Sequence, residues 1–251
     1  MNKNSLLTKA YRTLYLLAYI AIGLLVVLFS FSWISTLRKR QLIQWWSQHI
    51  TRAFNLDIQV HGMIPGNKQQ HVLFVANHVS WVDIFAINSI IPLRFIAKSE
   101  IKSWPIIGYL ATKANTLFIQ REKKQQANLM NLSIAQSLSQ GDNLCLFPEG
   151  TTTHGDNVYP FKASLFQAAI DANTVVWPIA IRYIDHHGKI DSEMAYADEI
   201  SLLASFNKVI SQPKPRVILH FLTPISANKV SDRQMLSFAA REAIVECLEQ
   251  H

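Results

Sequence analysis

Two short polar segments carry the residues whose types and spacing suit chemistry. The segment 77–83 places His78 five positions before Asp83, and the segment 147–151 places Glu149 next to a glycine. Each segment directly follows a short apolar run, which predicts a buried strand. We therefore expect both groups of polar side chains at strand ends, where they can reach a ligand.

His78 is the residue best suited to proton transfer. A histidine side chain has an unperturbed pKa of about 6.5, close to working pH. Its ring must present one nitrogen to the substrate and keep a proton on the other, and a carboxylate such as Asp83 fixes that tautomer. A substrate hydroxyl can itself be the nucleophile, which fits the absence of a Gly-x-Ser-x-Gly segment from the chain.

A purely local role for the same residues stays open at this point. Ser80-x-x-Asp83 also has the spacing of a capping box at the start of a helix. Asn77 would likewise satisfy backbone groups where the strand ends. A histidine and an aspartate alone therefore do not establish catalysis, and further motifs are needed.

Those motifs resemble the glycerolipid acyltransferases of the PlsC type. The segment 77–83 is similar to their first motif, in which the histidine acts as the base and the aspartate orients it. Lys98, Ile101, Gly108 and Arg121 follow at the spacing of the phosphate-binding motif, with isoleucine in place of the usual leucine. The resemblance implies that Lys98 and Arg121 hold the phosphate of a lysolipid, as a lysine charge and an arginine fork would. The alternative is that both are solvated surface charges.

The segment that contains Glu149 resembles the third motif of the family, which helps to bind the glycerol phosphate acceptor. By this resemblance Glu149, Gly150 and Thr151 belong to the substrate-binding site. Gly150 permits a tight turn or a close backbone approach to the substrate. Glu149 would accept a hydrogen bond from an acceptor hydroxyl or from Arg121, and an ion pair with that arginine is compatible with either reading.

The chain departs from the family pattern directly after this motif. Thr152 and Thr153 stand where arginine and serine are usual, which removes one expected phosphate ligand. The sequences of both main motifs also resemble those of family members that acylate lyso-ornithine lipid, an acceptor without a phosphate. Residues 177–179 resemble the fourth motif, but their apolar character favours a core strand.

The resemblance implies a specific reaction. A fatty acyl group would pass from acyl-CoA or acyl carrier protein to the sn-2 hydroxyl of 1-acyl-sn-glycerol 3-phosphate, giving phosphatidic acid. Neither a metal nor a bound cofactor is expected, since the thioester is a co-substrate. The alternatives are lyso-ornithine lipid or another lysophospholipid as acceptor, a transacylase that uses no thioester, and a non-catalytic lipid-binding module.

The N-terminus predicts a membrane anchor. Residues 13–37 contain no charge and 14–34 are almost wholly apolar, long enough for a helix that crosses a bilayer. Apolar residues recur at helical spacing over 42–56, which predicts a second helix that returns or lies in the interface. A single span followed by an ordinary surface helix is the alternative. We expect the inner membrane, with the catalytic domain on the cytoplasmic side.

The charge distribution also favours a lipid bilayer as partner. Residues 1–40 hold six basic groups and no acid, and residues 94–124 hold seven basic groups against two acids, so the rest of the chain is net negative within a total of +7. Such clusters suit anionic lipid. No nucleic-acid-binding module is recognisable, and nucleic acid is not an expected partner. The two cysteines are isolated and are expected to be buried thiols.

Behind the anchor, strand-like and helix-like segments alternate. Strands are predicted over 72–76, 95–97, 117–119, 144–147, 175–184 and 217–222, and helices over 81–90, 125–139, 161–172, 202–211 and 231–249. Several of the strands are continuous apolar runs, typical of a sheet covered on both faces. The expected fold is α/β, a mixed sheet covered by helices over residues 58–251, behind an anchor and interfacial helix over 1–57.

Overall fold

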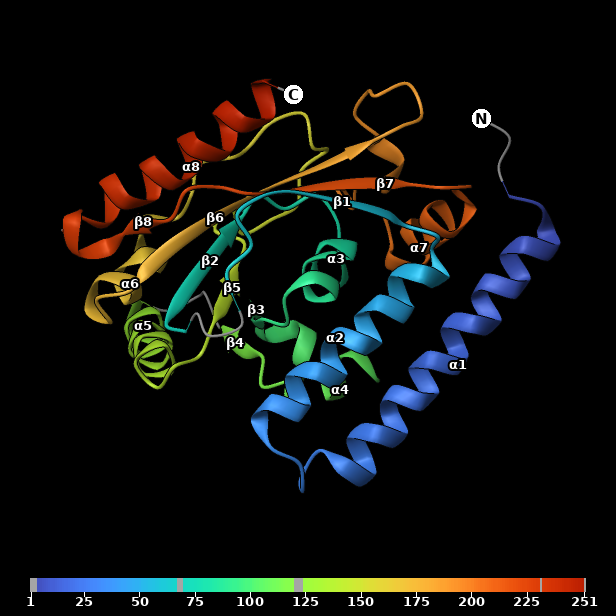
Figure 1. Ribbon diagram of the computed structural model, residues 1–251, viewed down its shortest axis with the longest axis horizontal. Helices are drawn as coiled ribbons and strands as arrows, with labels where there is room; N and C mark the ends of the chain where they lie inside the picture. The colour runs from blue at the N-terminus through green and yellow to red at the C-terminus, as the bar shows by residue number, and fades with distance from the viewer. Residues whose placement is uncertain (1–3, 67–69, 120–123, 231, 251) are drawn as a thin grey trace.

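The chain builds one mixed sheet behind two N-terminal helices (Figure 1). The computed structural model describes residues 4–66, 70–119, 124–230 and 232–250. The helices are α1 (Leu6–Ser30), α2 (Thr36–Ala53), α3 (Val82–Ile90), α4 (Ile107–Lys113), α5 (Lys124–Ser139), α6 (Gln167–Asp171), α7 (Leu202–Ser211) and α8 (Arg233–Gln250). Short 3-10 segments are η1 (Ser99–Ser103), η2 (Ala163–Phe166), η3 (Ser192–Met194) and η4 (Ala227–Lys229). The strands are β1 (Asp57–Gly62), β2 (Val72–Ala76), β3 (Arg94–Lys98), β4 (Leu117–Ile119), β5 (Leu144–Leu146), β6 (Val175–Ile184), β7 (Arg216–Phe221) and β8 (Ile225–Ser226).

The strand order brings the two polar segments together. It runs β1-β7-β6-β2-β5-β3-β4, with β8 paired to β6. Strand β2 is parallel to both β5 and β6, whereas β6 is antiparallel to β7 and β8. Val75 of β2 lies opposite Leu146 of β5. Because parallel neighbours end at the same edge of a sheet, the segments that follow β2 and β5 emerge side by side.

Alternating side chains of β2 enter two separate apolar cores. Val72, Phe74 and Ala76 pack with residues of α2, α3 and α7, and Leu73 and Val75 pack with residues of α5, α6 and α8. All five side chains are completely buried. Burying a large apolar side chain stabilises a fold by about 1.5–3 kcal/mol. The central strand therefore gives the segment that follows it a rigid support.

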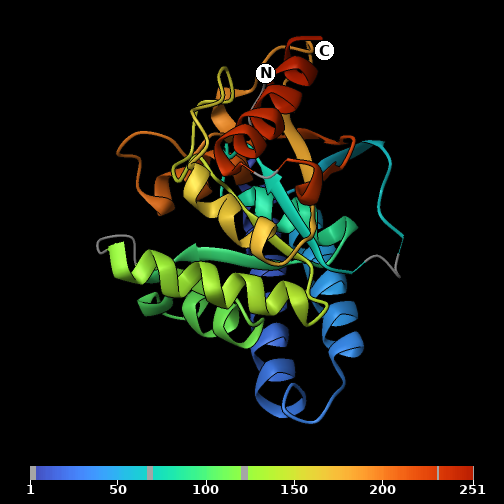
Figure 2. The ribbon, with the colours of Figure 1, turned by 90° about the vertical axis from the view of Figure 1, so that its left-hand side faces the viewer.

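Helices α1 and α2 form a hairpin that packs against the α/β domain and is hydrogen-bonded to it. The Trp46 indole of α2 donates to the Tyr19 carbonyl of α1 at 2.7 Å, and α2 packs along α3. At the other end of α1, the Arg12 guanidinium donates to the carbonyls of Gln212 and Pro213, just after α7. Figure 2 shows the turn of the hairpin extending beyond the rest of the molecule.

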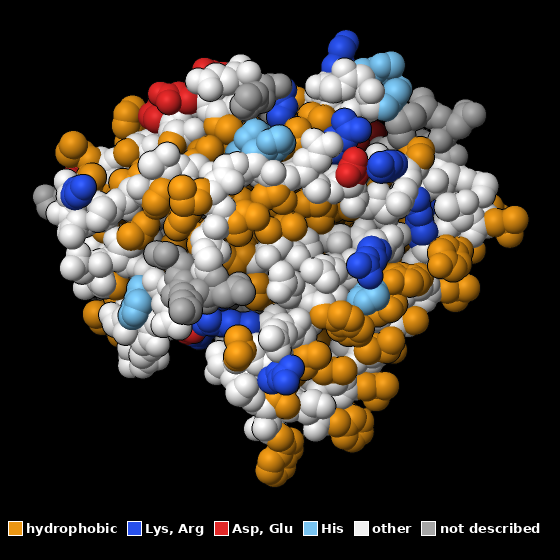
Figure 3. Space-filling view, viewed as in Figure 1, with side chains coloured by type: hydrophobic (Ala, Val, Ile, Leu, Met, Phe, Trp, Pro, Cys, Tyr) orange, Lys and Arg blue, Asp and Glu red, His pale blue; other side chains and the backbone are white. Residues whose placement is uncertain are grey.

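Helix α1 is 25 residues long and, by length and composition, apolar enough to cross a membrane. Most of its large apolar side chains face outward: Leu6, Leu7, Tyr11, Leu14, Leu17, Ile22, Leu25, Leu28 and Phe29 are exposed. The hairpin forms an edge of the molecule where apolar side chains gather (Figure 3). Such a surface indicates membrane association. The predicted boundary between anchor and domain stays a prediction, although β1 does begin at Asp57.

The expected α/β fold with a mixed sheet is confirmed, and most predicted elements are observed within one or two residues. Strands β1 and β8 and helix α4 were not predicted from the sequence. Strand β1 is half-buried along most of its length and, among the described strands, pairs with β7 alone, so it lacks the apolar run that marks a central strand. The helix predicted over 161–172 is shorter, because η2 precedes α6 and Asn173 ends it with a φ of 48°.

Candidate active site

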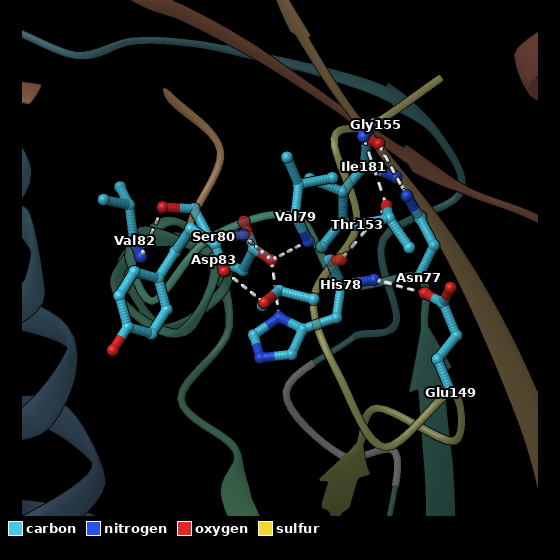
Figure 4. Close-up of polar contacts among 12 residues, drawn as sticks. Asn77, His78, Val79, Ser80, Val82, Asp83, Glu149, Thr153, Gly155 and Ile181 are labelled. Carbon is cyan, nitrogen blue, oxygen red and sulfur yellow. Dashed lines mark hydrogen bonds and ion pairs between the residues drawn. The ribbon is translucent and has the colours of Figure 1, made fainter. Parts of the chain in front are cut away.

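His78 and Asp83 form a hydrogen-bonded pair at the end of β2 (Figure 4). The Nδ1 of His78 lies 2.8 Å from the Oδ2 of Asp83. His78 is two residues beyond the strand, and Asp83 lies in the first turn of α3 with its side chain completely buried. A carboxylate in this position holds the proton of the imidazole on Nδ1. The other ring nitrogen, Nε2, points away from Asp83, and in a neutral ring with its proton on Nδ1 it is the atom with the lone pair.

Four donors surround the Asp83 carboxylate. Besides the imidazole, Oδ2 accepts the backbone N–H groups of Val79 at 2.9 Å and Ser80 at 3.0 Å. Its Oδ1 accepts the hydroxyl of Tyr183 at 2.7 Å. The bond from Ser80 is the one that a capping box supplies, so the local role and the pairing with His78 coexist. This set of donors compensates the burial of a charged group.

The imidazole of His78 lies flat on the ring of Phe147, which follows β5. The two ring centroids are 3.8 Å apart and the planes differ by 9°. The His78 side chain is 19% exposed, so one edge of the ring is accessible. Stacking on one face and the hydrogen bond to Asp83 together leave the ring a single orientation.

Glu149 connects the third motif to the first through a hydrogen bond. Its Oε1 accepts the backbone N–H of His78 and its Oε2 accepts the backbone N–H of Tyr159, each at 2.7 Å. The residue is 4% exposed. Burial raises the pKa of Glu149 to about 7, although the two backbone donors favour the charged form. The expected hydrogen bond to an acceptor hydroxyl stays a prediction, and the observed contacts indicate a positioning role.

Further bonds fix the backbone on both sides of His78. The side-chain amide of Asn77 exchanges two hydrogen bonds with the backbone of Ile181, at 2.9 and 2.8 Å, which extends the pairing of β2 and β6. The backbone N–H of Thr153 donates to the His78 carbonyl at 2.8 Å. The hydroxyl of Thr152 donates to the Tyr196 carbonyl. The two threonines that replace the usual arginine and serine therefore connect loops at the site.

The other residues predicted to bind substrate differ in how exposed they are. Lys98 ends β3 at the same edge of the sheet and its side chain is exposed. Gly150 has a φ of 78° in the turn after β5, a conformation that favours glycine, and Thr151 beside it is exposed. Gly108 is buried in α4, where a Cβ atom would lie 2.2 Å from the Lys102 carbonyl, so packing alone requires a glycine. Arg121 lies outside the described residues.

An apolar cavity of about 190 Å³ lies between the hairpin and the edge of the sheet. Its walls come from α1, α2, α3, β3, η1 and α4, and include Gly23, Trp46, Phe85, Phe95 and Ile107. Phe95 stacks on Phe147, with centroids 5.9 Å apart, and Phe147 carries the His78 ring. Two stacked aromatic rings, those of Phe95 and Phe147, therefore connect one wall of the cavity to the pair of His78 and Asp83, called the dyad below. The fourth motif does not line this cavity: Trp177 and Ile179 are buried in β6, as expected of a core strand.

Neither Tyr183 nor the cavity was predicted from the sequence, although Ile101 of the phosphate-binding motif is one of the cavity's lining residues. Tyr183 lies in the apolar run of β6, and a tyrosine in a buried strand usually has a partner for its hydroxyl. That signal indicates a hydrogen bond without naming the acceptor. The cavity combines six elements that are distant in sequence, and no local pattern predicts it.

The site thus pairs a histidine with a buried carboxylate, close to an apolar cavity. A model of the family described as Acyltransferase matches residues 57–182, half of the chain. The chain is 40% identical over 195 residues to a 1-acyl-sn-glycerol-3-phosphate acyltransferase of Neisseria meningitidis, covering 78% of this chain and 76% of that one. It is 36% identical over 211 residues to a lyso-ornithine lipid O-acyltransferase of Pseudomonas aeruginosa, covering 84% and 79%. The chain belongs to the acyltransferase family, and the resemblance found in its motifs is confirmed.

A solved structure has the same fold. It is the 1-acyl-sn-glycerophosphate (LPA) acyltransferase PlsC from Thermotoga maritima, which superimposes with a TM-score of 0.72 at 19% identity and covers 98% of this chain and 96% of its own. The match includes the N-terminal helices, since it extends over nearly the whole chain. At this identity the similarity concerns the fold alone.

Proposed function

We propose that this acyltransferase transfers a fatty acyl group to the sn-2 hydroxyl of 1-acyl-sn-glycerol 3-phosphate, giving phosphatidic acid. The observation that carries the proposal is the pair of His78 and Asp83, whose hydrogen bond of 2.8 Å leaves the Nε2 atom for the acceptor hydroxyl. The donor is the thioester of acyl-CoA or acyl carrier protein. Since the thioester already activates the acyl group, the proposed reaction needs neither a metal nor a bound cofactor.

Each proton in the proposed reaction has a defined place. The Nε2 atom of His78 takes the proton of the acceptor hydroxyl while its oxygen attacks the thioester carbonyl. Asp83 holds the opposite N–H and stabilises the imidazolium that forms. The tetrahedral intermediate then collapses, the C–S bond breaks, and the imidazolium returns its proton to the leaving thiolate. Ester and thiol are released, and His78 is neutral again.

The phosphate of the acceptor would bind at the carboxyl edge of the sheet. Lys98 ends β3 there with an exposed ammonium group, and we propose that Arg121 joins it. A phosphomonoester carries nearly two charges, which a lysine and an arginine neutralise and orient. Gly150 and Thr151 would shape the floor under the glycerol part, because they follow Glu149, whose carboxyl group accepts the backbone N–H of His78.

The apolar cavity would hold an acyl chain of one of the substrates. Its lining is almost entirely apolar, and Phe95 connects it through Phe147 to His78. A chain bound there would place its polar end near the imidazole. The cavity also adjoins the hairpin, through Gly23 and Trp46, so a lipid could enter from the membrane side. We propose that the hairpin seats the enzyme on the inner membrane, with the domain on the cytoplasmic side.

Lyso-ornithine lipid is a second candidate acceptor. The observation that favours it is Thr152, which stands where a phosphate-binding arginine is usual and whose hydroxyl is bonded to a neighbouring loop. An acceptor without a phosphate would not need that arginine. Both candidates use the same dyad and the same proton transfer.

An acceptor panel tests the proposal. Purified enzyme in detergent receives radiolabelled acyl-CoA with lysophosphatidate, lysophosphatidylethanolamine or lyso-ornithine lipid in separate reactions. Label that moves preferentially to lysophosphatidate supports the first candidate, and label that moves only to lyso-ornithine lipid supports the second. His78→Ala should abolish transfer to every acceptor while the protein stays folded. Turnover near the wild-type rate in that variant would refute the assignment of the base.

The phosphate site has a matched test within the same segment. We expect Lys98→Ala to raise KM for lysophosphatidate about tenfold, because a charge-assisted contact contributes roughly 1.5–3 kcal/mol. Lys102→Ala is the control, since Lys102 is an exposed lysine of η1 that matches no motif position. Equal KM values for the two variants would place the phosphate elsewhere.

A further inference from the structure

Tyr183 contacts the dyad although no motif contains it. Its hydroxyl donates to the Oδ1 of Asp83 at 2.7 Å, across 100 positions of sequence. Among the described residues it is the only hydrogen-bond donor recorded for that oxygen, because the imidazole and two backbone groups all bond to Oδ2. The phenol therefore occupies the side of the carboxylate opposite His78.

The strand register explains how the phenol reaches this point. Ala76, the last residue of β2, lies opposite Ile179 of β6, and β6 continues beyond it. The amide of Asn77 holds the backbone of Ile181 at the next step of the ladder. Tyr183 is two residues further, on the same face as Ile181, and both belong to the core that includes α3. The first motif thus bonds to β6 at two points: Asn77 holds the backbone of Ile181, and Asp83 accepts the hydroxyl of Tyr183.

The phenol stays a hydrogen-bond donor at every working pH. Burial and the charge of Asp83 raise the pKa of Tyr183 well above its usual value. The other titratable groups that face Asp83 are His78, Cys145 of β5 and Glu149. Burial raises the pKa of the Cys145 thiol, so it stays neutral. Burial raises the pKa of Glu149 to about 7, so its charge changes near neutrality.

We propose that Tyr183 is a positioning residue for acyl transfer, which holds the Asp83 carboxylate so that Oδ2 faces His78. The inference rests on the proposed role of His78 as the base. Without the hydroxyl, Oδ1 would be a buried charged oxygen lacking a donor, and the carboxylate would turn toward another one. A turned carboxylate aims the Nε2 of His78 less accurately at the acceptor hydroxyl, and this loss of orientation lowers kcat. Tyr183 itself does not touch the reacting atoms.

Tyr183→Phe is the direct test, since it removes one oxygen and keeps the packing of the ring. We expect kcat to fall about tenfold while KM for the acceptor stays within about twofold, as for an interaction made through the base alone. We also expect the acid limb of the pH profile to move to higher pH, because an Asp83 with fewer donors stabilises the imidazolium more strongly. Wild type and variant are compared at each pH, so the titration of Glu149 is common to both.

Two controls separate positioning from a general loss of structure. Thr51→Val removes another buried hydroxyl, which donates to the Gln48 carbonyl at 3.0 Å, and should leave the pH profile unchanged. In an Asp83→Asn background the loss of the Tyr183 hydroxyl should cost almost nothing more, because the phenol acts through that carboxylate. Thermal unfolding in detergent checks that every variant is folded.

The possible outcomes distinguish this inference from the proposed function. If Tyr183→Phe retains kcat within twofold and the wild-type pH profile, the inference is wrong, although an inactive His78→Ala would still support the base. If the hydroxyl costs a full tenfold in the Asp83→Asn background too, the phenol acts elsewhere and the inference is also wrong. If His78→Ala itself retains activity, the assignment of the base fails and this inference fails with it, whereas a wild type that transfers no label to any acceptor would refute the proposed function.

Discussion

Glu149→Gln gives a sharp test of how the two motifs are joined. In the wild type each carboxylate oxygen accepts one backbone N–H at 2.7 Å, from His78 and from Tyr159. Glutamine has nearly the same shape but only one oxygen, so its NH₂ group must face one of those two donors. The side chain is 4% exposed, and water has little access to replace the lost bond. We therefore expect the substitution to loosen the backbone of His78 or of Tyr159.

The magnitude follows from burial and charge together. An unsatisfied buried N–H costs about 1–3 kcal/mol of stability. Burial raises the pKa of Glu149 from its usual 4.5 to about 7, so the folded state binds the proton more tightly than the unfolded state. The contribution of Glu149 to the stability of the wild type should then be fully present below pH 4.5 and fall as pH rises to about 7, by about 3 kcal/mol at 1.36 kcal/mol per pKa unit. Glutamine carries no charge and lacks this contribution.

Thermal unfolding between pH 5 and pH 8, followed by circular dichroism in detergent, measures the difference. Near pH 5 the Glu149→Gln variant should unfold at a lower temperature than the wild type, by about 2–4 °C for each kcal/mol. Near pH 8 the two should converge, because the wild type then holds a buried charge. Glu246→Gln, at an exposed glutamate of α8, should show neither effect.

Kinetics on the same samples separate the two roles of Glu149. A positioning role predicts that kcat falls with KM for the acceptor nearly unchanged, since His78 is displaced while the acceptor contacts remain. A role in binding the acceptor hydroxyl predicts the opposite split. A tenfold rise in KM with unchanged kcat and unchanged unfolding temperatures would refute the positioning argument.

Three further substitutions test the frame around the site. Gly108→Ala places a Cβ atom 2.2 Å from the Lys102 carbonyl and should lower stability by about 1–3 kcal/mol; an unfolding temperature equal to that of the wild type would contradict this packing. Gly23→Ala places a Cβ atom 2.7 Å from the Trp46 indole and should push that ring into the cavity. In competition assays the enzyme should then prefer shorter acyl chains, in the acyl-CoA donor or in the acceptor. An unchanged chain-length preference would exclude the cavity as the acyl site. Arg12→Ala removes two hydrogen bonds between α1 and the segment after α7 and should increase protease cleavage between hairpin and domain in detergent, whereas an unchanged digestion pattern would show that packing alone holds the hairpin.

Much of the frame was predictable from local patterns. The continuous apolar runs of β2 and β6 identified central strands because both faces of those strands are buried. The spacing from His78 to Asp83 was informative because the chain turns from strand to helix within five residues, which fixes the pair locally. The charge-free run at the N-terminus likewise predicted a long apolar helix over 14–34, and α1 is such a helix, although it begins at Leu6 and ends at Ser30.

The tertiary structure decided the partners that complete the site. Glu149 was predicted as a ligand of the acceptor, yet its oxygens meet backbone groups of two other segments, one of them 71 positions away. Tyr183 reaches Asp83 only because β6 lies beside β2 and extends past its end. The cavity exists only where the hairpin closes over β3 and α4. Periodicity and spacing record which residues share a strand or a helix, whereas these contacts depend on which elements become neighbours, a choice made by the packing of the whole sheet.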